Sequence, residues 1–169
     1  VATYLEQFIP RAIQLAAELE QAAERAAEPA LAPRFVWTTG SWLIDQALER
    51  ADTAGRRALE DAINRGWLRW HALPFTTHTE LADATLLRAG LGISQRLDAR
   101  FGRCTRSAKM TDVPGHTLAL VPLLEEAGIK LLHIGVNPAS RLPQLPPAFT
   151  WRGPAGQRVS VLYGSGYGD

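Results

Sequence analysis

The most informative stretch of the chain reads Lys109-Met110-Thr111-Asp112-Val113-Pro114-Gly115-His116-Thr117. It indicates a strand that ends in a carboxylate, followed by a Pro-Gly turn that brings a histidine to the start of a helix. In proteins built from βα repeats, catalytic side chains collect at this strand-to-helix join. Asp112 and His116 are therefore the first candidates for a functional site.

The sequence on both sides of this stretch alternates between predicted helices and strands. Apolar periodicity and capping residues predict helices at residues 4–28, 41–50, 53–66, 81–97 and 117–127, the fourth interrupted near Gly90 and Gly92. Short runs, the first of them β-branched and aromatic, predict strands at residues 34–38, 67–75, 107–110, 130–135, 149–152 and 157–163. This order predicts an α/β fold with parallel strands and helical crossovers. The pattern fits an open sheet and part of a barrel equally well.

Composition narrows the class of protein. With 169 residues, 46% of them hydrophobic, the chain is long enough for one core and is expected to form a single domain over residues 1–169. Its 18 basic and 17 acidic residues give no electrostatic reason to expect a nucleic acid or an anionic membrane as partner. No apolar run approaches the roughly 20 residues that span a bilayer. The single cysteine, Cys104, excludes an internal disulfide.

Two interpretations of the Asp112 segment stand side by side. A carboxylate at a strand end needs a partner, such as a metal ion, a helix N-terminus or a basic group. The Asp-x-Pro-Gly sequence is also good turn chemistry, and the pattern favours neither interpretation. His116 could be a metal ligand, or it could hydrogen-bond to a ligand and orient it. The competing interpretation is that His116 belongs to the first turn of the helix and bonds to the backbone.

A second polar group follows the predicted strand at residues 67–75. His78 and Glu80 lie in a Thr-rich loop. Because the loops of neighbouring βα units converge, both side chains could line the same pocket mouth as Asp112. The competing interpretation, slightly favoured by the pattern, is that Thr77 or Thr79 caps the next helix with Glu80 in its first turn.

Several catalytic motifs are absent from the sequence. No G-x-G-x-x-G or G-x-x-x-x-G-K-[ST] follows a predicted strand, which argues against a nucleotide site. There is no H-E-x-x-H, no paired CxxC and no G-x-S-x-G, which weakens zinc-protease and serine-hydrolase interpretations.

The blocks of this sequence, read in order, resemble the N-terminal catalytic domain of family 38 glycoside hydrolases, the retaining α-mannosidases. Thr111 to Thr117 is similar to that family's "I-D-P-F-G-H-S" block, and the resemblance spans about residues 8–169. The other matching blocks are Phe35-Val36-Trp37 with Ser41-Trp42-Leu43, the L-E-D-A-I-N-R-G-W run from Leu59 to Trp67, Val121-Pro122-Leu123-Leu124 with Ala127-Gly128-Ile129, Phe149-Thr150-Trp151-Arg152, and Tyr167-Gly168-Asp169.

This resemblance implies a partial (β/α)7 barrel, of which the chain is the central segment. It implies that Asp112 is both a zinc ligand and the nucleophile that forms a glycosyl-enzyme intermediate. His116 would support the residues that bind the metal without binding it itself, and Tyr167 would contact the substrate. Glu80 falls on the Glu of the family's "D-E" pair, and His78 lies two residues before it. The remaining zinc ligands and the acid that protonates the leaving group would lie outside this chain.

The sequence thus predicts a segment of a metal-dependent, retaining, α-mannosidase-like glycosidase that acts on carbohydrate and is inactive as this segment alone. One alternative is a metal-dependent polysaccharide deacetylase, which would need a His-x-x-x-His pair that this sequence lacks. The other is a barrel that binds carbohydrate without catalysis. Oligomeric state and compartment are not indicated.

Overall fold

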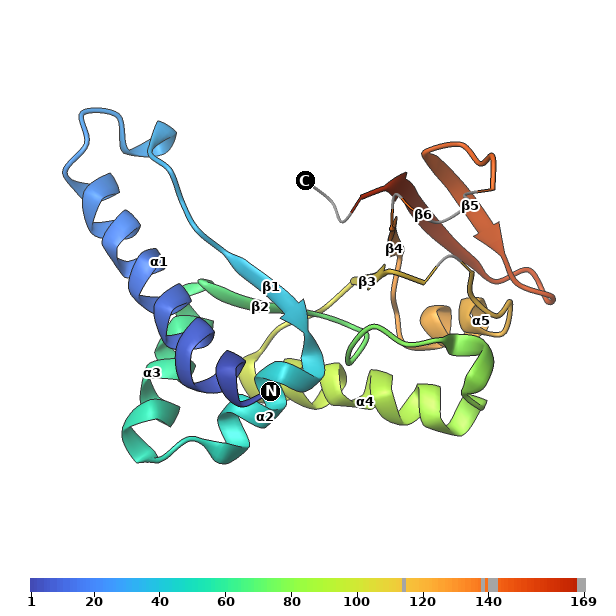
Figure 1. The fold of residues 1–169 in the computed structure, drawn as a ribbon, viewed down its shortest axis with the longest axis horizontal. Coiled ribbons are helices and arrows are strands. Elements are labelled where there is room, and N and C mark those ends of the chain that lie inside the picture. The colour runs from blue at the N-terminus through green and yellow to red at the C-terminus, as the bar shows by residue number, and fades with distance from the viewer. Residues whose placement is uncertain (114, 138, 140–142, 167–169) are drawn as a thin grey trace. The chain divides into compact units, whose positions relative to one another are not determined.

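The computed structural model describes residues 1–113, 115–137, 139 and 143–166. The chain divides into two compact units, one made of Val1–Thr39 and Leu43–Arg69, the other of Gly40–Trp42 and Trp70–Asp169. Strands β1 (Trp37–Gly40) and β2 (Leu68–His71) pair as a two-stranded sheet (Figure 1).

The first unit is mainly helical. It contains a π-helical turn η1 (Tyr4–Phe8), α1 (Ile9–Glu24), a short 3-10 turn η2 (Pro29–Leu31), most of α2 (Ser41–Arg50) and α3 (Thr53–Arg65). Its core is built from one apolar face of each long helix together with the start of β2. The buried residues are Ile9, Ala12, Ala16, Ala23, Ile44, Ala47, Leu48, Leu59, Ala62, Ile63 and Leu68.

Asp52 and Gly66 set the two ends of α3. The Asp52 carboxylate accepts a hydrogen bond of 2.7 Å from the Gly55 amide and so caps the helix. Gly66 ends the helix in the left-handed conformation, with φ of 83°, where a Cβ would be unfavourable. The sharp stop at Gly66 leads the chain directly into β2.

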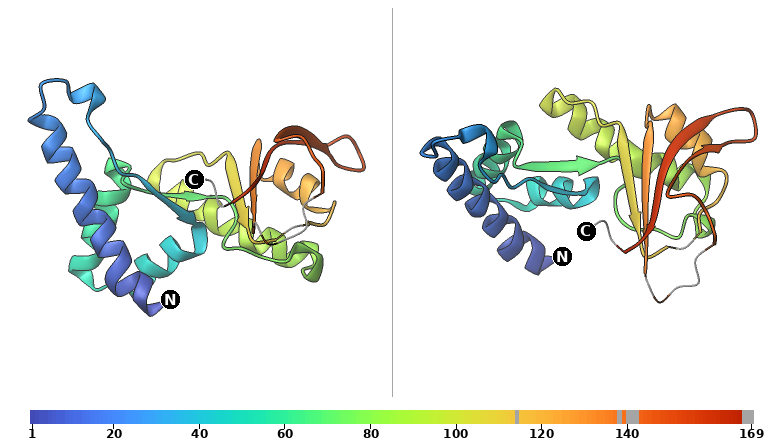
Figure 2. Two further views of the ribbon diagram at one scale, coloured as in Figure 1. Left: turned by 45° about the horizontal axis from the view of Figure 1, so that its top comes forward. Right: turned by 90° about the horizontal axis from the view of Figure 1, so that it is seen from above.

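The second unit contains a four-stranded sheet in the order β3-β4-β6-β5 (Figure 2). Its strands are β3 (Ser107–Thr111), β4 (Leu131–Val136), β5 (Ala148–Arg152) and β6 (Arg158–Ser165). β4 lies between β3 and β6 and is parallel to both, and β5 is antiparallel to β6. The helical elements of the unit are η3 (Thr79–Leu81), α4 (Ala84–Phe101) and α5 (Leu120–Glu126).

One face of this sheet carries the core of the second unit. Alternate strand residues such as Met110, Leu132 and Val161 are buried, and they belong to one cluster with residues of α4 and α5, including Leu91 and Leu124. Because side chains alternate along a strand, the intervening residues of β3 lie on the opposite face. The burial pattern therefore fixes the register that brings Thr111 opposite Gly135 at the carboxyl ends of β3 and β4.

The predicted α/β class with parallel strands and helices is confirmed, while the sheets are small and unclosed. The strands predicted at residues 149–152 and 157–163 are β5 and β6, and β5 pairs antiparallel with β6. The first long helix ends at Glu24, short of residue 28. The strands predicted at residues 34–38 and 67–75 are Trp37–Gly40 and Leu68–His71.

The prediction that the fourth helix is interrupted near Gly90 and Gly92 is wrong, because α4 runs unbroken through both residues. Packing explains why residue 90 is a glycine. A Cβ on Gly90 would lie 3.0 Å from Cγ of Pro74, closer than ordinary contacts. This glycine thus allows a close approach between the helix and the segment after β2. Among the described residues, no helix is both long enough and apolar enough to cross a membrane.

Asp98 joins α4 to the segments before and after it. Its carboxylate accepts hydrogen bonds from the Trp70 indole at 2.9 Å, the Thr105 amide at 2.7 Å and the Thr105 hydroxyl at 2.8 Å. Three donors on one partly buried carboxylate anchor the start of β3 against the end of β2.

We expect the substitution Asp98→Ala to lower the free energy of unfolding by about 2 to 4 kcal/mol, because it leaves these donors unpaired. Urea unfolding followed by tryptophan fluorescence measures the change. The matched control is Asp61→Ala, which removes an exposed ion pair with Arg65 and should cost less than about 1 kcal/mol. Equal losses in the two variants would contradict the anchoring role of Asp98.

Candidate functional site

Asp112 is held at the carboxyl end of β3 by its backbone. Its amide donates a hydrogen bond of 3.0 Å to the carbonyl oxygen of Gly135, so the ladder between β3 and β4 continues one residue past the strand. Asp112 has φ of 65° and is the one non-glycine residue with positive φ among the described residues. Asp and Asn tolerate this left-handed conformation better than most residues. The chain turns sharply here, and the Asp112 side chain is exposed.

The loop that follows β2 meets this turn. The hydroxyl groups of Thr76 and Thr111 are 3.0 Å apart and form a hydrogen bond. Thr111 immediately precedes Asp112, so this bond brings the two strand-to-helix loops together beside the candidate carboxylate.

Thr79 provides the second connection between the two loops. Its side chain is fully buried. Its hydroxyl accepts a hydrogen bond from the Thr117 amide at 3.0 Å and is 3.2 Å from Nδ1 of His116. The alternative prediction that Thr77 or Thr79 caps the following helix is wrong, because Asp83 caps α4 by accepting from the Leu86 amide at 2.8 Å. Thr79 is therefore the structural residue of the site that sequence reasoning missed, and the Thr-rich run was its only signal.

His116 is held as a neutral imidazole. Burial, and secondarily the charge of His78, lowers the pKa of His116 from 6.5 to about 4. Its Nε2 is buried and has no hydrogen-bond partner among the described residues. When the Thr79 hydroxyl donates to Nδ1, the proton of the ring is on Nε2, which is then an unused donor. The imidazole can thus hydrogen-bond a further group without carrying a charge at neutral pH.

The structure brings His78, Glu80 and His116 into one neighbourhood. His78 is near enough for its charge to lower the pKa of His116. The Glu80 carboxylate oxygen Oε1 is 3.5 Å from the position that a Cβ on Gly115 would occupy. Both His78 and Glu80 are exposed. Gly115 and His116 follow Asp112 in the same loop, so all four candidates lie on two adjoining loops. The fifth candidate, Tyr167, is outside the described residues.

The donor set of these loops does not by itself make a metal centre. Within the part of the chain that the structure describes, no group of three or more His, Cys, Asp or Glu side chains could hold a metal ion. Asp112 contributes one exposed carboxylate, whereas zinc sites ordinarily use three or four protein ligands. The expectation that zinc binds here with most of its ligands from outside this chain stays a prediction.

Comparisons with known proteins give the fold a context. No protein-family model matches the sequence, and a comparison with curated proteins finds no significant match. Among solved structures, an α-mannosidase from Enterococcus faecalis V583 is similar with a TM-score of 0.65 and 16% identity, over 90% of this chain and 17% of the enzyme. A second Enterococcus faecalis protein, described as belonging to glycosyl hydrolase family 38, has a TM-score of 0.59 and 14% identity, over 93% of this chain and 17% of that protein.

The fold of this chain is similar to part of a family 38 glycosyl hydrolase. A 4-α-glucanotransferase from Thermococcus litoralis is similar as well, with a TM-score of 0.62 and 14% identity, over 96% of this chain and 24% of the enzyme. The chain thus spans a quarter or less of the length of each of these enzymes. At these identities the likeness concerns the fold, and it confirms the fold resemblance to family 38 that the sequence blocks indicate.

The buried histidines make the stability of the protein depend on pH. The pKa of His71, like that of His116, is lowered to about 4, by burial first and by the charge of Lys109 second. In the unfolded chain each histidine takes up a proton near pH 6.5. Below pH 6.5 the unfolded state therefore binds more protons than the folded state, and stability falls as the pH drops toward 4.

We expect the variant His116→Asn, which keeps a polar atom near the position of Nδ1, to lose less stability than the wild type between pH 7 and pH 4.5. Urea midpoints at the two pH values measure the difference. His71→Asn serves as a parallel test at a second buried histidine. A pH dependence unchanged by His116→Asn would mean that the folded protein protonates His116 as readily as the unfolded chain does.

Proposed function

We propose that this chain is the central part of the catalytic domain of a retaining, α-mannosidase-like glycoside hydrolase, with Asp112 as the nucleophile. One observation carries the proposal: an exposed carboxylate is held in a left-handed turn at the carboxyl end of a parallel strand. That strand belongs to a chain whose fold is similar to parts of an α-mannosidase and a 4-α-glucanotransferase.

The position of Asp112 suits this role. In parallel α/β structures, binding and catalytic residues lie at the carboxyl ends of strands and in the loops that follow. Left-handed backbone at a non-glycine residue is frequent at functional sites, where it aims a side chain out of the ladder. We further propose that residues outside this chain complete a (β/α)7 barrel, and that residues 1–169 form part of one such domain.

The proposed reaction has two steps. A carboxylate oxygen of Asp112 attacks the anomeric carbon of the sugar, and the bond from that carbon to the leaving-group oxygen breaks. An acid outside the described residues donates the proton that the leaving group requires. Water then attacks the same carbon and gives a proton to the acid that was deprotonated in the first step, so that Asp112 leaves as a carboxylate and the original anomeric configuration returns. Replacement of water by a second sugar hydroxyl would give transfer in place of hydrolysis.

Neighbouring groups have supporting roles in this proposal. Thr79 fixes the ring of His116, so that Nε2 of a neutral imidazole can hydrogen-bond the substrate or an adjacent ligand. Glu80 and His78 border the same loops and are proposed to contact sugar hydroxyls. Tyr167 remains a proposed substrate contact from the sequence resemblance. Zinc, if it binds with ligands from outside this chain, would supply positive charge that orients sugar hydroxyl groups.

The decisive test is a pair of substitutions at Asp112 in the longest natural polypeptide that contains this sequence. Asp112→Asn and Asp112→Gly both suit positive φ, so the turn at this position should form in each variant. If Asp112 is the nucleophile, both variants should lose hydrolysis of aryl α-mannoside by roughly 10³-fold or more, because the covalent step is removed. Activity assays, with thermal unfolding as the folding control, measure this.

Retention of activity in the Asp112→Gly variant would make Asp112 a turn residue and overturn the assignment. Two further measurements define the mechanism. Proton NMR of the first product should show the α-anomer, and mass spectrometry of enzyme treated with a fluorinated mannosyl fluoride should find the sugar on the Asp112 peptide. Loss of activity with chelator, restored by zinc, would support the metal. No cleavage of any aryl glycoside would favour the deacetylase or the non-catalytic carbohydrate-binding alternative.

A further inference from the structure

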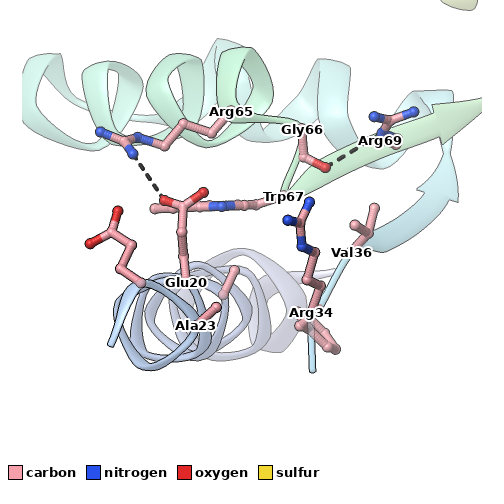
Figure 3. A pocket seen from close by; sticks show the side chains of 11 residues that line it. Glu20, Ala23, Arg34, Val36, Arg65, Gly66, Trp67 and Arg69 are labelled. Carbon is pink, nitrogen blue, oxygen red and sulfur yellow. Dashed lines mark hydrogen bonds and ion pairs between the residues drawn. The ribbon is translucent and has the colours of Figure 1, made fainter. Parts of the chain in front are cut away.

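The first unit contains a cavity of about 380 Å³ that the proposed function does not use. Its walls come from α1, from the segment that precedes β1, and from the junction where α3 ends and β2 begins (Figure 3). Three arginines and two glutamates line it: Arg34, Arg65, Arg69, Glu20 and Glu24. In Figure 3, Trp67 lies edge-on across the cavity, between the pair formed by Arg65 with Glu20 and the side chain of Arg34.

Arg65 is already committed to the structure. Its guanidinium pairs with Glu20 at 3.0 Å and with Asp61 at 2.9 Å. It also lies over the ring of Trp67, with 5.1 Å between the guanidinium carbon and the ring centroid. These contacts join α3 to α1 and hold Trp67 in place. Arg65 is therefore already paired with two carboxylates, and together with Glu20 it forms one wall of the cavity.

The other donors in the cavity have few acceptors. Arg34 makes no hydrogen bond or ion pair with any described residue. The Arg69 guanidinium has one bond, from Nε to the carbonyl oxygen of Gly66 at 3.4 Å, which orients it over that glycine. A Cβ on Gly66 would lie 3.2 Å from Nη2 of Arg69, so the glycine leaves room for this position. The indole N–H of Trp67 likewise has no acceptor among the described residues.

We propose that this cavity binds a phosphorylated sugar, with its phosphate held by Arg34, Arg69 and the Trp67 indole. Guanidinium groups match phosphate oxygens in charge and in bidentate geometry. Two guanidinium groups without acidic partners balance the charge of a phosphate monoester, which is close to −2 at neutral pH. A carboxylate would balance only one of them.

The remaining walls select the sugar part of the ligand. Glu24 is exposed and has no partner among the described residues, so it can accept hydrogen bonds from hydroxyl groups. Its charge would repel a bare anion placed beside it. The volume is within the range of roughly 300 to 1,000 Å³ of small-molecule sites, which is larger than a phosphate ion requires. These features favour a phosphate attached to a polyhydroxyl body over free phosphate.

The proposal is tested by calorimetric titration of the longest natural polypeptide containing this chain with mannose 6-phosphate, mannose and inorganic phosphate. We expect binding of mannose 6-phosphate that weakens with added salt. Arg34→Gln and Arg69→Gln should each weaken this binding about tenfold or more, because each removes a charge-assisted pair. The matched control is Arg57→Gln, an exposed arginine of α3 that does not line the cavity.

Thermal unfolding of each variant without ligand checks that it is folded. We expect Arg34→Gln to fold normally, because the Arg34 side chain makes no hydrogen bond or ion pair with a described residue. Mannose 6-phosphate binding that is absent in the wild type, or unchanged in both cavity variants, would overturn the proposal. Inorganic phosphate or mannose binding as tightly as mannose 6-phosphate would also overturn it, in favour of a free-anion site or a neutral-sugar site. The choice of mannose as the sugar rests on the proposed function. The test measures binding and does not involve Asp112, so its failure is distinguishable from failure of the proposed glycosidase activity.

Discussion

The hydrogen bond from the Asp112 amide to the Gly135 carbonyl is the contact on which the candidate site depends. It extends the pairing of β3 with β4 to the last possible residue and forces the chain to turn at Asp112 itself. A residue in left-handed conformation cannot continue a strand, so the side chain leaves the alternation of the sheet. The result is a carboxylate that is exposed to solvent although its backbone is fixed by a parallel ladder. Accessibility and rigid placement are the two properties that a nucleophile requires.

Threonine hydroxyl groups join the two loops around Asp112. The Thr76–Thr111 bond and the contacts of Thr79 with His116 and the Thr117 amide connect them. Because Thr79 is fully buried, its bonds are shielded from water and from salt. These contacts between uncharged groups keep the loop positions independent of pH near neutrality.

Local signals in the sequence were sufficient to predict where β3 ends and where α3 begins and ends. The turn sequence Asp-Val-Pro-Gly, which follows Met110 and Thr111, predicts that β3 ends at Asp112. Asp52 and Gly66 predict the ends of α3 for the same reason: a cap and a left-handed stop are properties of single residues. The parallel pairing of β3 with β4 follows from the helix between them.

Long-range packing decided the features that the sequence did not predict. Gly90 resembles a helix breaker in isolation, but its role is the close contact with Pro74, a residue 16 positions away in the sequence. Thr79 resembles a helix cap, yet the cap is Asp83 and Thr79 bonds to His116, which is 37 positions away. The placement of β5 on the far side of β6 depends likewise on which edge of the sheet is free. Each of these depends on a partner that no local window contains.

Electrostatics links the geometry of the loops to the chemistry proposed for them. Burial lowers the pKa of His116 to about 4, so its imidazole adds no positive charge to these loops at pH 7. Loops that carry exposed carboxylates and a neutral imidazole disfavour an anionic reacting group and favour one that develops positive charge. The oxocarbenium-like transition state of glycoside cleavage is of that kind, whereas the tetrahedral intermediate of deacetylation develops negative charge. Unless a metal ion reverses the local sign, the described loops are better matched to cleavage of a glycosidic bond.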